Sequence, residues 1–115
     1  MLFRSEAEVV DLYVPYVMPQ ENGGRTDCRR LELTDGTRRL HVGGSDVFQF
    51  SAHHFTAGDL YAARHTNELK PRPEVFVTLD HKHCGLGTGS CGPATLQRYR
   101  VRPGTYRFSF CFALS

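Results

Sequence analysis

Residues 28–42 read CRRLELTDGTRRLHV, and this stretch decides the fold of the chain. Polar and apolar side chains alternate with a period of two in residues 31–34 and again in residues 38–42, which is typical of strands that bury one face. Asp35 and Gly36 separate the two runs. An Asp-Gly pair in this position is a strong hairpin signal, because both residues can adopt a positive φ. The stretch therefore predicts a β-hairpin.

Outward from the hairpin, most of the chain also carries strand patterns. The candidate segments are residues 13–18, 47–53, 74–80, 99–101 as an edge, and 105–114. The last segment places four aromatic side chains on one face, namely those of Tyr106, Phe108, Phe110 and Phe112. Four aromatic side chains on one face need cover, so we expect this strand at the centre of the core.

One segment has the period of a helix instead. Thr56 and Asp59 have the spacing of a capping box, and apolar residues follow at helical spacing as far as His65. We expect a helix of about ten residues, which the prolines of residues 70–73 would stop. About seven strands and one short helix predict an all-β protein, an antiparallel β-sandwich.

Composition excludes several classes of protein. The chain has 115 residues, a formal net charge of +2 and four cysteines. Its basic residues form no dense tract, which argues against a nucleic-acid binder. No apolar run approaches the ~18 residues that cross a bilayer, and the N-terminus lacks the apolar region of a signal peptide. We therefore expect no membrane contact and a cytoplasmic location, where the few cysteines stay reduced.

One cluster of side chains has the residue types of a metal site. His81, His83, Cys84 and Cys91 include the ligand types of tetrahedral zinc, but without Cys-x-x-Cys spacing. Cys84 or Cys91 beside a histidine is also the minimal pair for nucleophilic catalysis. Polar positions in a loop are the simpler interpretation. In another loop, Glu21, Arg25 and Asp27 are expected to form an ion-pair network that holds the turn of residues 22–24.

Several stretches resemble the C-terminal domain of the glycoside hydrolase family 2 β-galactosidases. Residues 13–27, YVPYVMPQENGGRTD, are similar to the family segment YxxPQENGxRxD. The similarity continues in order to about residue 112, through residues 48–56, 59–60, 65–69, 79–87, 89–93 and 106–110. It implies a galactose-mutarotase-like supersandwich, of which this chain is similar to the C-terminal half. Residues 1–12 then form a lead-in, and residues 13–115 form the C-terminal part of the supersandwich domain.

The resemblance also implies where the chemistry lies. Retaining hydrolysis needs two carboxyl groups about 5–5.5 Å apart, and in the family these lie in a separate (β/α)₈ barrel. The magnesium and sodium ligands of the family lie in other domains too, so no catalytic residue, metal ligand or cofactor is assigned to this chain. The partners implied are the remainder of the β-galactosidase polypeptide and galactosides such as lactose.

The family loop that reaches the mouth of the active site corresponds to residues 85–93. In some members a tryptophan in this loop stacks on the sugar, whereas Cys91 stands at or beside that position here. The candidate substrate-rim residues are His81, His83, Ser90 and Cys91. A cysteine has no aromatic face, so the stacking contact is not expected in this chain.

Two alternatives remain open at this point. The first is a free-standing carbohydrate-binding or aldose-epimerase-like module, in which His53 or His65 would form an acid–base pair with Glu21. The second is a small zinc protein built on the histidine and cysteine cluster. Under the main interpretation, half of a large sandwich leaves strand edges and an apolar face uncovered, so we expect the isolated chain to self-associate as a dimer.

Overall fold

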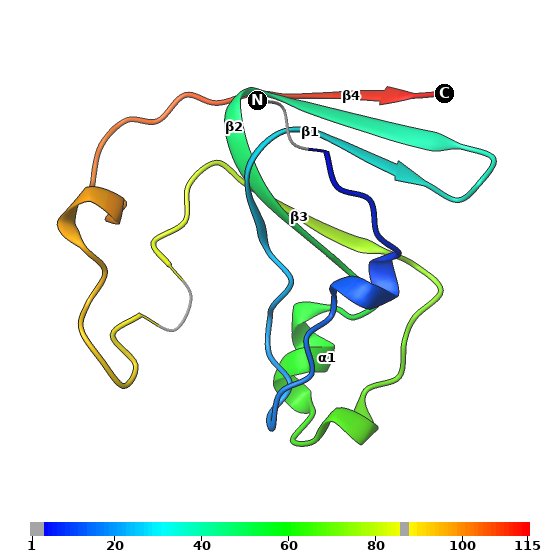
Figure 1. Cartoon of the computed structure of the whole chain (residues 1–115), viewed down its shortest axis with the longest axis horizontal. Coiled ribbons are helices and arrows are strands. Elements are labelled where there is room, and N and C mark those ends of the chain that lie inside the picture. The colour runs from blue at the N-terminus through cyan, green and yellow to red at the C-terminus, as the bar shows by residue number, and fades with distance from the viewer. Residues whose placement is uncertain (1–3, 86–87) are drawn as a thin grey trace. The chain divides into compact units, whose positions relative to one another are not determined.

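The computed structural model describes residues 4–85 and 88–115 (Figure 1). The described part contains four strands, one α-helix and three short 3₁₀ helices. In chain order they are η1 (Val9–Leu12), β1 (Arg25–Thr34), β2 (Arg39–His53), α1 (Ala57–Ala62), η2 (Thr66–Glu68), β3 (Phe76–Asp80), η3 (Gln97–Tyr99) and β4 (Phe110–Leu114). The strands form one sheet in the order β1-β2-β3, and β4 also pairs with β2.

The chain divides into two compact units. Unit 1 comprises Met1–Arg25 and Phe50–Leu79, and unit 2 comprises Thr26–Gln49 and Asp80–Ser115. Each unit has a small apolar core of its own. The buried apolar side chains of unit 1 are Leu12, Ala52, Leu60 and Ala63, and those of unit 2 are Leu31, Val42 and Phe48.

The predicted hairpin is confirmed, since β1 and β2 are neighbours joined by a short turn. Its turn chemistry differs from the expectation, because Gly36 has a positive φ of 90° whereas Asp35 does not. Asp35 instead begins the turn, and its carboxylate accepts hydrogen bonds from the backbone N–H groups of Thr37 (3.0 Å) and Arg38 (2.7 Å). An aspartate that bonds the backbone two and three residues ahead fixes a turn without a strained φ of its own.

Strand β2 is longer than the sequence predicts. Residues 38–42 and 47–53 carry separate strand patterns, but β2 runs without interruption through the glycines between them. Gly44 is required there for space. A Cβ at this position would lie 2.6 Å from the carbonyl oxygen of Asp46 and 3.0 Å from the rings of Phe48 and Phe108. The missing side chain lets these two rings pack directly against the strand.

The predicted C-terminal strand is wrong in extent and in burial. Strand β4 begins only at Phe110, because the ladder ends at Ser45 and Ser109. Ser45 N–H donates to the carbonyl of Ser109 (2.9 Å), but Ser109 N–H donates to the hydroxyl of Ser45 (3.2 Å) and not to its carbonyl. The strand is also not central to the core. Phe110 is half-buried and contacts Phe48 edge to face at 5.6 Å, whereas Phe112 is 58% exposed.

Two other predicted elements are corrected. The capping box of Thr56 and Asp59 is confirmed, but α1 ends at Ala62 because the N–H of Arg64 donates to the Glu68 carboxylate (2.9 Å) and the chain turns into η2. The edge strand predicted at residues 99–101 is absent from the described residues. Local hydrogen bonds such as Tyr99 N–H to Leu96 O (2.9 Å) form η3 there instead.

The described chain is thus all-β, mostly antiparallel, sandwich-like and with a single short α-helix, as the sequence predicts for the fold class. The expected number of about seven strands is wrong, since the described residues form four. The difference arises from the joining of two predicted strands in β2, and from the irregular course of residues 13–18 and 99–109.

Candidate functional site

The predicted substrate-rim residues all lie in unit 2, in the segment that follows β3. His81 packs against aromatic rings, with its ring stacked on Phe108 at 4.3 Å and 24° and edge to face with Tyr106 at 6.1 Å. Its Nδ1 is buried and has no hydrogen-bond partner among the described residues. Lys82 places its Nζ 4.8 Å from the centre of the Tyr106 ring, a cation–π contact. His81 is therefore held in place by packing.

His83 is exposed and has a defined tautomer. Its Nδ1 accepts a hydrogen bond from the N–H of Gly85 (3.0 Å), so Nδ1 is unprotonated and the neutral ring carries its hydrogen on Nε2. Gly85 has a φ of 93°, and a Cβ there would lie 2.8 Å from the hydroxyl of Thr88. The local backbone thus fixes His83 so that Nε2 is a hydrogen-bond donor.

Ser90 and Cys91 are exposed in a turn that follows Gly89, whose φ is 85°. Positions 86 and 87 of the predicted loop lie outside the described residues. The loop is fastened at its base, because the Thr95 hydroxyl donates to the carbonyl of Cys84 (2.7 Å). Within the described residues, the side chains of the four predicted rim residues make no hydrogen bond to one another. The structure therefore puts them in one segment without assembling them into a bonded cluster.

The arginines that follow the loop hold their own segment together. Arg100 donates from Nε to the carbonyl of Thr95 (2.8 Å), and Arg102 donates to the side-chain oxygen of Gln97 (2.8 Å). Arg98 lies over the ring of Tyr99 at 4.6 Å. These contacts give the alternating arginines a structural role.

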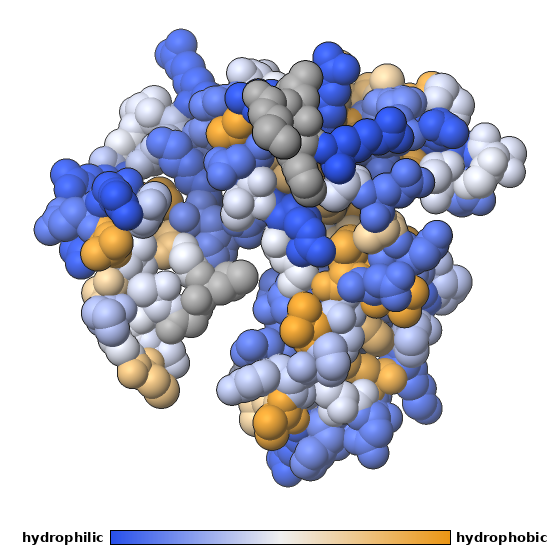
Figure 2. Space-filling model, viewed as in Figure 1, coloured by the Kyte–Doolittle hydropathy of each residue, from blue (hydrophilic) through white to orange (hydrophobic). Residues whose placement is uncertain are grey.

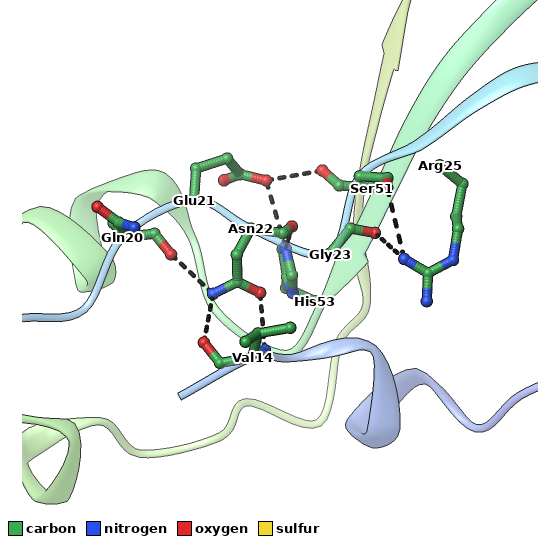
Figure 3. Close-up of polar contacts among 9 residues, drawn as sticks. Val14, Gln20, Glu21, Asn22, Gly23, Arg25, Ser51 and His53 are labelled. Carbon is green, nitrogen blue, oxygen red and sulfur yellow. Dashed lines mark hydrogen bonds and ion pairs between the residues drawn. The ribbon is translucent and has the colours of Figure 1, made fainter. Parts of the chain in front are cut away.

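The most densely bonded cluster lies in unit 1, around the sequence motif QENGG (Figure 3). The Asn22 side chain accepts from Val14 N–H (3.0 Å) and donates to the carbonyls of Val14 (3.1 Å) and Gln20 (3.0 Å). Asn22 thus uses its oxygen and both of its N–H groups to bind the extended segment before it. Arg25 donates to the carbonyls of Gly23 (3.1 Å) and Gly24 (3.4 Å), so it holds the glycine turn through main-chain oxygens.

His53 and Glu21 meet in this cluster, where both make contacts that hold the motif. His53 is 3% exposed, and its Nε2 lies 2.6 Å from the carbonyl oxygen of Asn22 and 3.3 Å from the Glu21 carboxylate. A carbonyl oxygen only accepts, so Nε2 carries a hydrogen and cannot act as a base. Glu21 also accepts from the Ser51 hydroxyl at 2.7 Å (Figure 3). The cluster fastens the end of β2 to the motif.

The other sequence-based alternatives receive no support from the geometry. His65 pairs with Glu68 on the surface, at 3.1 Å, and not with Glu21. In residues 4–85 and 88–115, no three His, Cys, Asp or Glu side chains are arranged to hold a metal ion. In the same residues no helix is long and apolar enough to cross a membrane.

The structural role of His53 and His54 is a feature that sequence reasoning missed. His54 directly follows β2, and its Nδ1 donates to the carbonyls of Arg72 (2.9 Å) and Glu74 (3.2 Å). Two adjacent histidines at the end of a strand give no signal for this pairing, because their partners are main-chain atoms of distant segments.

Fold and site together define an all-β module. Its QENGG motif holds the scaffold together, and the exposed segment with His83 and Ser90 carries hydrogen-bond donors. The family described as "Beta galactosidase small chain" matches residues 3–112. The chain belongs to this β-galactosidase small-chain family.

Named relatives agree with this assignment. The chain is 35% identical over 105 residues, 90% of its length, to a β-galactosidase of Alteromonas mediterranea. It is 36% identical over 100 residues, 86% of its length, to a β-galactosidase of Pseudoalteromonas haloplanktis, and 28% identical over 95 residues, 83% of its length, to one of Staphylococcus xylosus. It covers 10%, 9% and 10% of these three relatives, respectively, and so spans about a tenth of their length.

Proposed function

We propose that this chain is the C-terminal, non-catalytic part of a β-galactosidase that hydrolyses terminal β-D-galactosides such as lactose. Residues 13–115 form part of its sandwich domain, and residues 1–12 lead into it. The observation that carries the proposal is the family match over residues 3–112 in a chain that spans about a tenth of its relatives. The remaining polypeptide supplies the catalytic carboxylates, and this part supplies scaffold, subunit contacts and the rim of the active site.

The enzyme works in the cytoplasm under this proposal. Cys84, Cys91 and Cys111 are exposed thiols. Exposed thiols persist in a reducing compartment, where disulfides are rare.

A chimaeric enzyme tests this role. In the Alteromonas mediterranea relative, the tenth that matches this chain would be replaced by it, and hydrolysis of a chromogenic β-galactoside would be measured. We expect the chimaera to retain activity within about tenfold, since residues that do no chemistry alter the barrier little. The isolated chain, and the relative with this tenth deleted, should be inactive. A folded but inactive chimaera, or hydrolysis by the isolated chain, would contradict the proposal.

At the rim, each predicted residue has a distinct part in the proposal. His83 offers its Nε2–H and Ser90 its hydroxyl to sugar hydroxyl groups, since both side chains are exposed. His81, stacked on Phe108, supports the base of the loop. Cys91 leaves the rim without the aromatic face that would stack on a sugar ring. Sugar contact here therefore depends on hydrogen bonds.

An NMR titration of the chain with galactose and lactose tests the rim. We expect saturable amide shifts confined to residues 81–95, reduced several-fold by Ser90→Ala. Ser5→Ala is the matched control, because it removes an exposed hydroxyl far along the chain and should leave the shifts unchanged. A well-dispersed spectrum without shifts at high millimolar sugar would refute sugar contact by the rim and leave only the scaffold role.

We also propose that the isolated chain self-associates. Leu114 is 81% exposed, Phe112 is 58% exposed and Tyr106 is 44% exposed. Burial of such apolar surface favours association by roughly 25 cal/mol per Å² removed from water. Light scattering over a range of concentrations measures this directly.

A further inference from the structure

One edge of strand β4 has main-chain groups that point away from its sheet. Arg39 and Ser115 exchange two backbone hydrogen bonds, 2.8 and 3.0 Å long, and the register pairs His41 with Ala113 and Gly43 with Cys111. In an antiparallel pair, hydrogen-bonded and non-hydrogen-bonded positions alternate. Ala113 and Cys111 therefore turn their N–H and C=O groups toward β2. Residues 110, 112 and 114 turn theirs to the opposite side.

No described strand lies on that side of β4. The strand pairs with β2 and with no other described strand, and it lies at the margin of the sheet (Figure 1). Along the same strand, the side chains of Phe112 and Leu114 are 58% and 81% exposed, whereas that of Phe110 is half-buried. Three unpaired main-chain positions beside exposed apolar side chains form a template for another strand.

This edge also lacks the features that usually prevent pairing between edges. Natural edge strands carry a charged side chain, a proline or a bulge for that purpose. Residues 110–114 read FCFAL, with no charge, proline or glycine. The edge therefore carries no charge that would repel the same edge of a second copy.

We propose that β4 pairs with β4 of a second copy of this chain, antiparallel and edge to edge, with the two-fold axis at Phe112. The outward-facing positions are symmetric about Phe112, so this register pairs all three: Phe112 with its counterpart, and Phe110 with Leu114 in both directions. The apolar side chains of these residues then lie on one face across the junction. The inference rests on the self-association proposed above and is independent of any sugar contact.

A charge at the axis tests the pairing. The variant Phe112→Lys sets two ammonium groups opposite each other, and like charges directly opposite destabilise strand pairs. In sedimentation velocity, we expect the dimer dissociation constant to rise by about tenfold or more. Leu96→Lys is the matched control, because Leu96 is 60% exposed but lies outside the strands, and it should leave dimerisation unchanged.

Cross-linking tests the register. At the new junction Cys111 would face position 113 of the partner subunit as a non-hydrogen-bonded pair, with Cα atoms about 4.5 Å apart, within the range of a disulfide. Ala113→Cys, with Cys84→Ser and Cys91→Ser to remove the exposed thiols, should give an oxidised covalent dimer. Adding Cys111→Ser should abolish it.

The outcomes separate this inference from the broader proposal. A dimer that survives Phe112→Lys, or that fails to cross-link through Ala113→Cys, would overturn pairing through β4 and leave self-association standing. A chain that stays monomeric at high concentration would overturn both, and would point to a strand of another protein as the occupant of this edge. A dimer sensitive to the charge and cross-linked in the stated register would establish the pairing.

Discussion

Gly23 shows at the scale of one residue why the motif QENGG has its sequence. Its φ is 69°, and a Cβ there would lie 2.5 Å from the carbonyl oxygen of Leu12 and 3.1 Å from the His53 ring. Asn22 binds the preceding segment on one side, while its carbonyl receives the His53 hydrogen bond at 2.6 Å on the other. A side chain at position 23 would force these contacts apart. The glycine of the motif thus meets two requirements, a positive φ and the close approach of neighbouring atoms.

Two glycine variants separate backbone strain from collision. Gly23→Ala should destabilise the fold by roughly 2–4 kcal/mol, because left-handed strain and a clash with main-chain atoms add. Gly36 has a φ of 90°, and no atom lies within 4 Å of the position that a Cβ would take there. Gly36→Ala should therefore cost about 1 kcal/mol from strain alone. Urea denaturation curves give both values, and equal losses for the two variants would remove the argument for a collision at Gly23.

At the scale of elements, local signals predict local structure well. The hairpin and the capping box are confirmed because the residues that specify them lie within four positions of one another. The extent of β4 could not be predicted, because it depends on a hydroxyl of Ser45 that lies 64 residues from its partner Ser109. The end of α1 likewise depends on the carboxylate of Glu68, which captures the N–H of Arg64.

The hairpin turn and the helix cap both depend on ionised carboxylates. Hydrogen bonds from the Arg38 backbone and side chain, and from the Thr37 backbone, lower the pKa of Asp35 from 3.8 to about 2. The Arg72 guanidinium, which binds Asp59 at 2.7 and 2.8 Å, and then the Thr56 cap hold the Asp59 pKa well below its ordinary value. A lowered pKa in the folded state means that folding favours the ionised form.

The free energy of unfolding should therefore decrease as the pH falls from about 4 to about 2. Between pH 4 and pH 2 the unfolded chain binds more protons at Asp35 than the folded chain, so the contribution of Asp35 is complete above about pH 4 and is lost toward about pH 2. Thermal denaturation across this range measures the slope. Asp35→Asn should flatten it, whereas Asp46→Asn, which keeps the bonds between Asp35 and Arg38, should leave it unchanged. An unaltered slope in Asp35→Asn would refute this role of the turn.

At the scale of the whole molecule, the fold class and the family follow from sequence, whereas the burial of the last strand does not. The aromatic face of residues 106–112 predicts a central strand only if the chain supplies something to cover it. In the described residues β4 is an edge, and the side chains of Val14, Val17 and Met18 in unit 1 are also exposed. Figure 2 shows hydrophobic residues on the visible surface of the molecule. A sequence pattern records which face is apolar, but not which polypeptide buries it.

The candidate site shows the same division between local and distant information. The positive φ of Gly85 and Gly89 follows the glycine pattern of the predicted loop. The stacking of His81 on Phe108 joins residues 27 positions apart, and no spacing rule predicts it. Sequence therefore indicates where a loop lies, while the orientation of its side chains depends on packing against distant strands.

The bond between the Thr95 hydroxyl and the Cys84 carbonyl has a consequence for evolution. It holds the two ends of the loop together, so the intervening residues can change in number or kind without disturbing the strands. The entropic cost of closing a loop grows only slowly with its length, and loops on rigid scaffolds commonly carry specificity. Such a design allows the sequence of the loop to change independently of the framework that holds it.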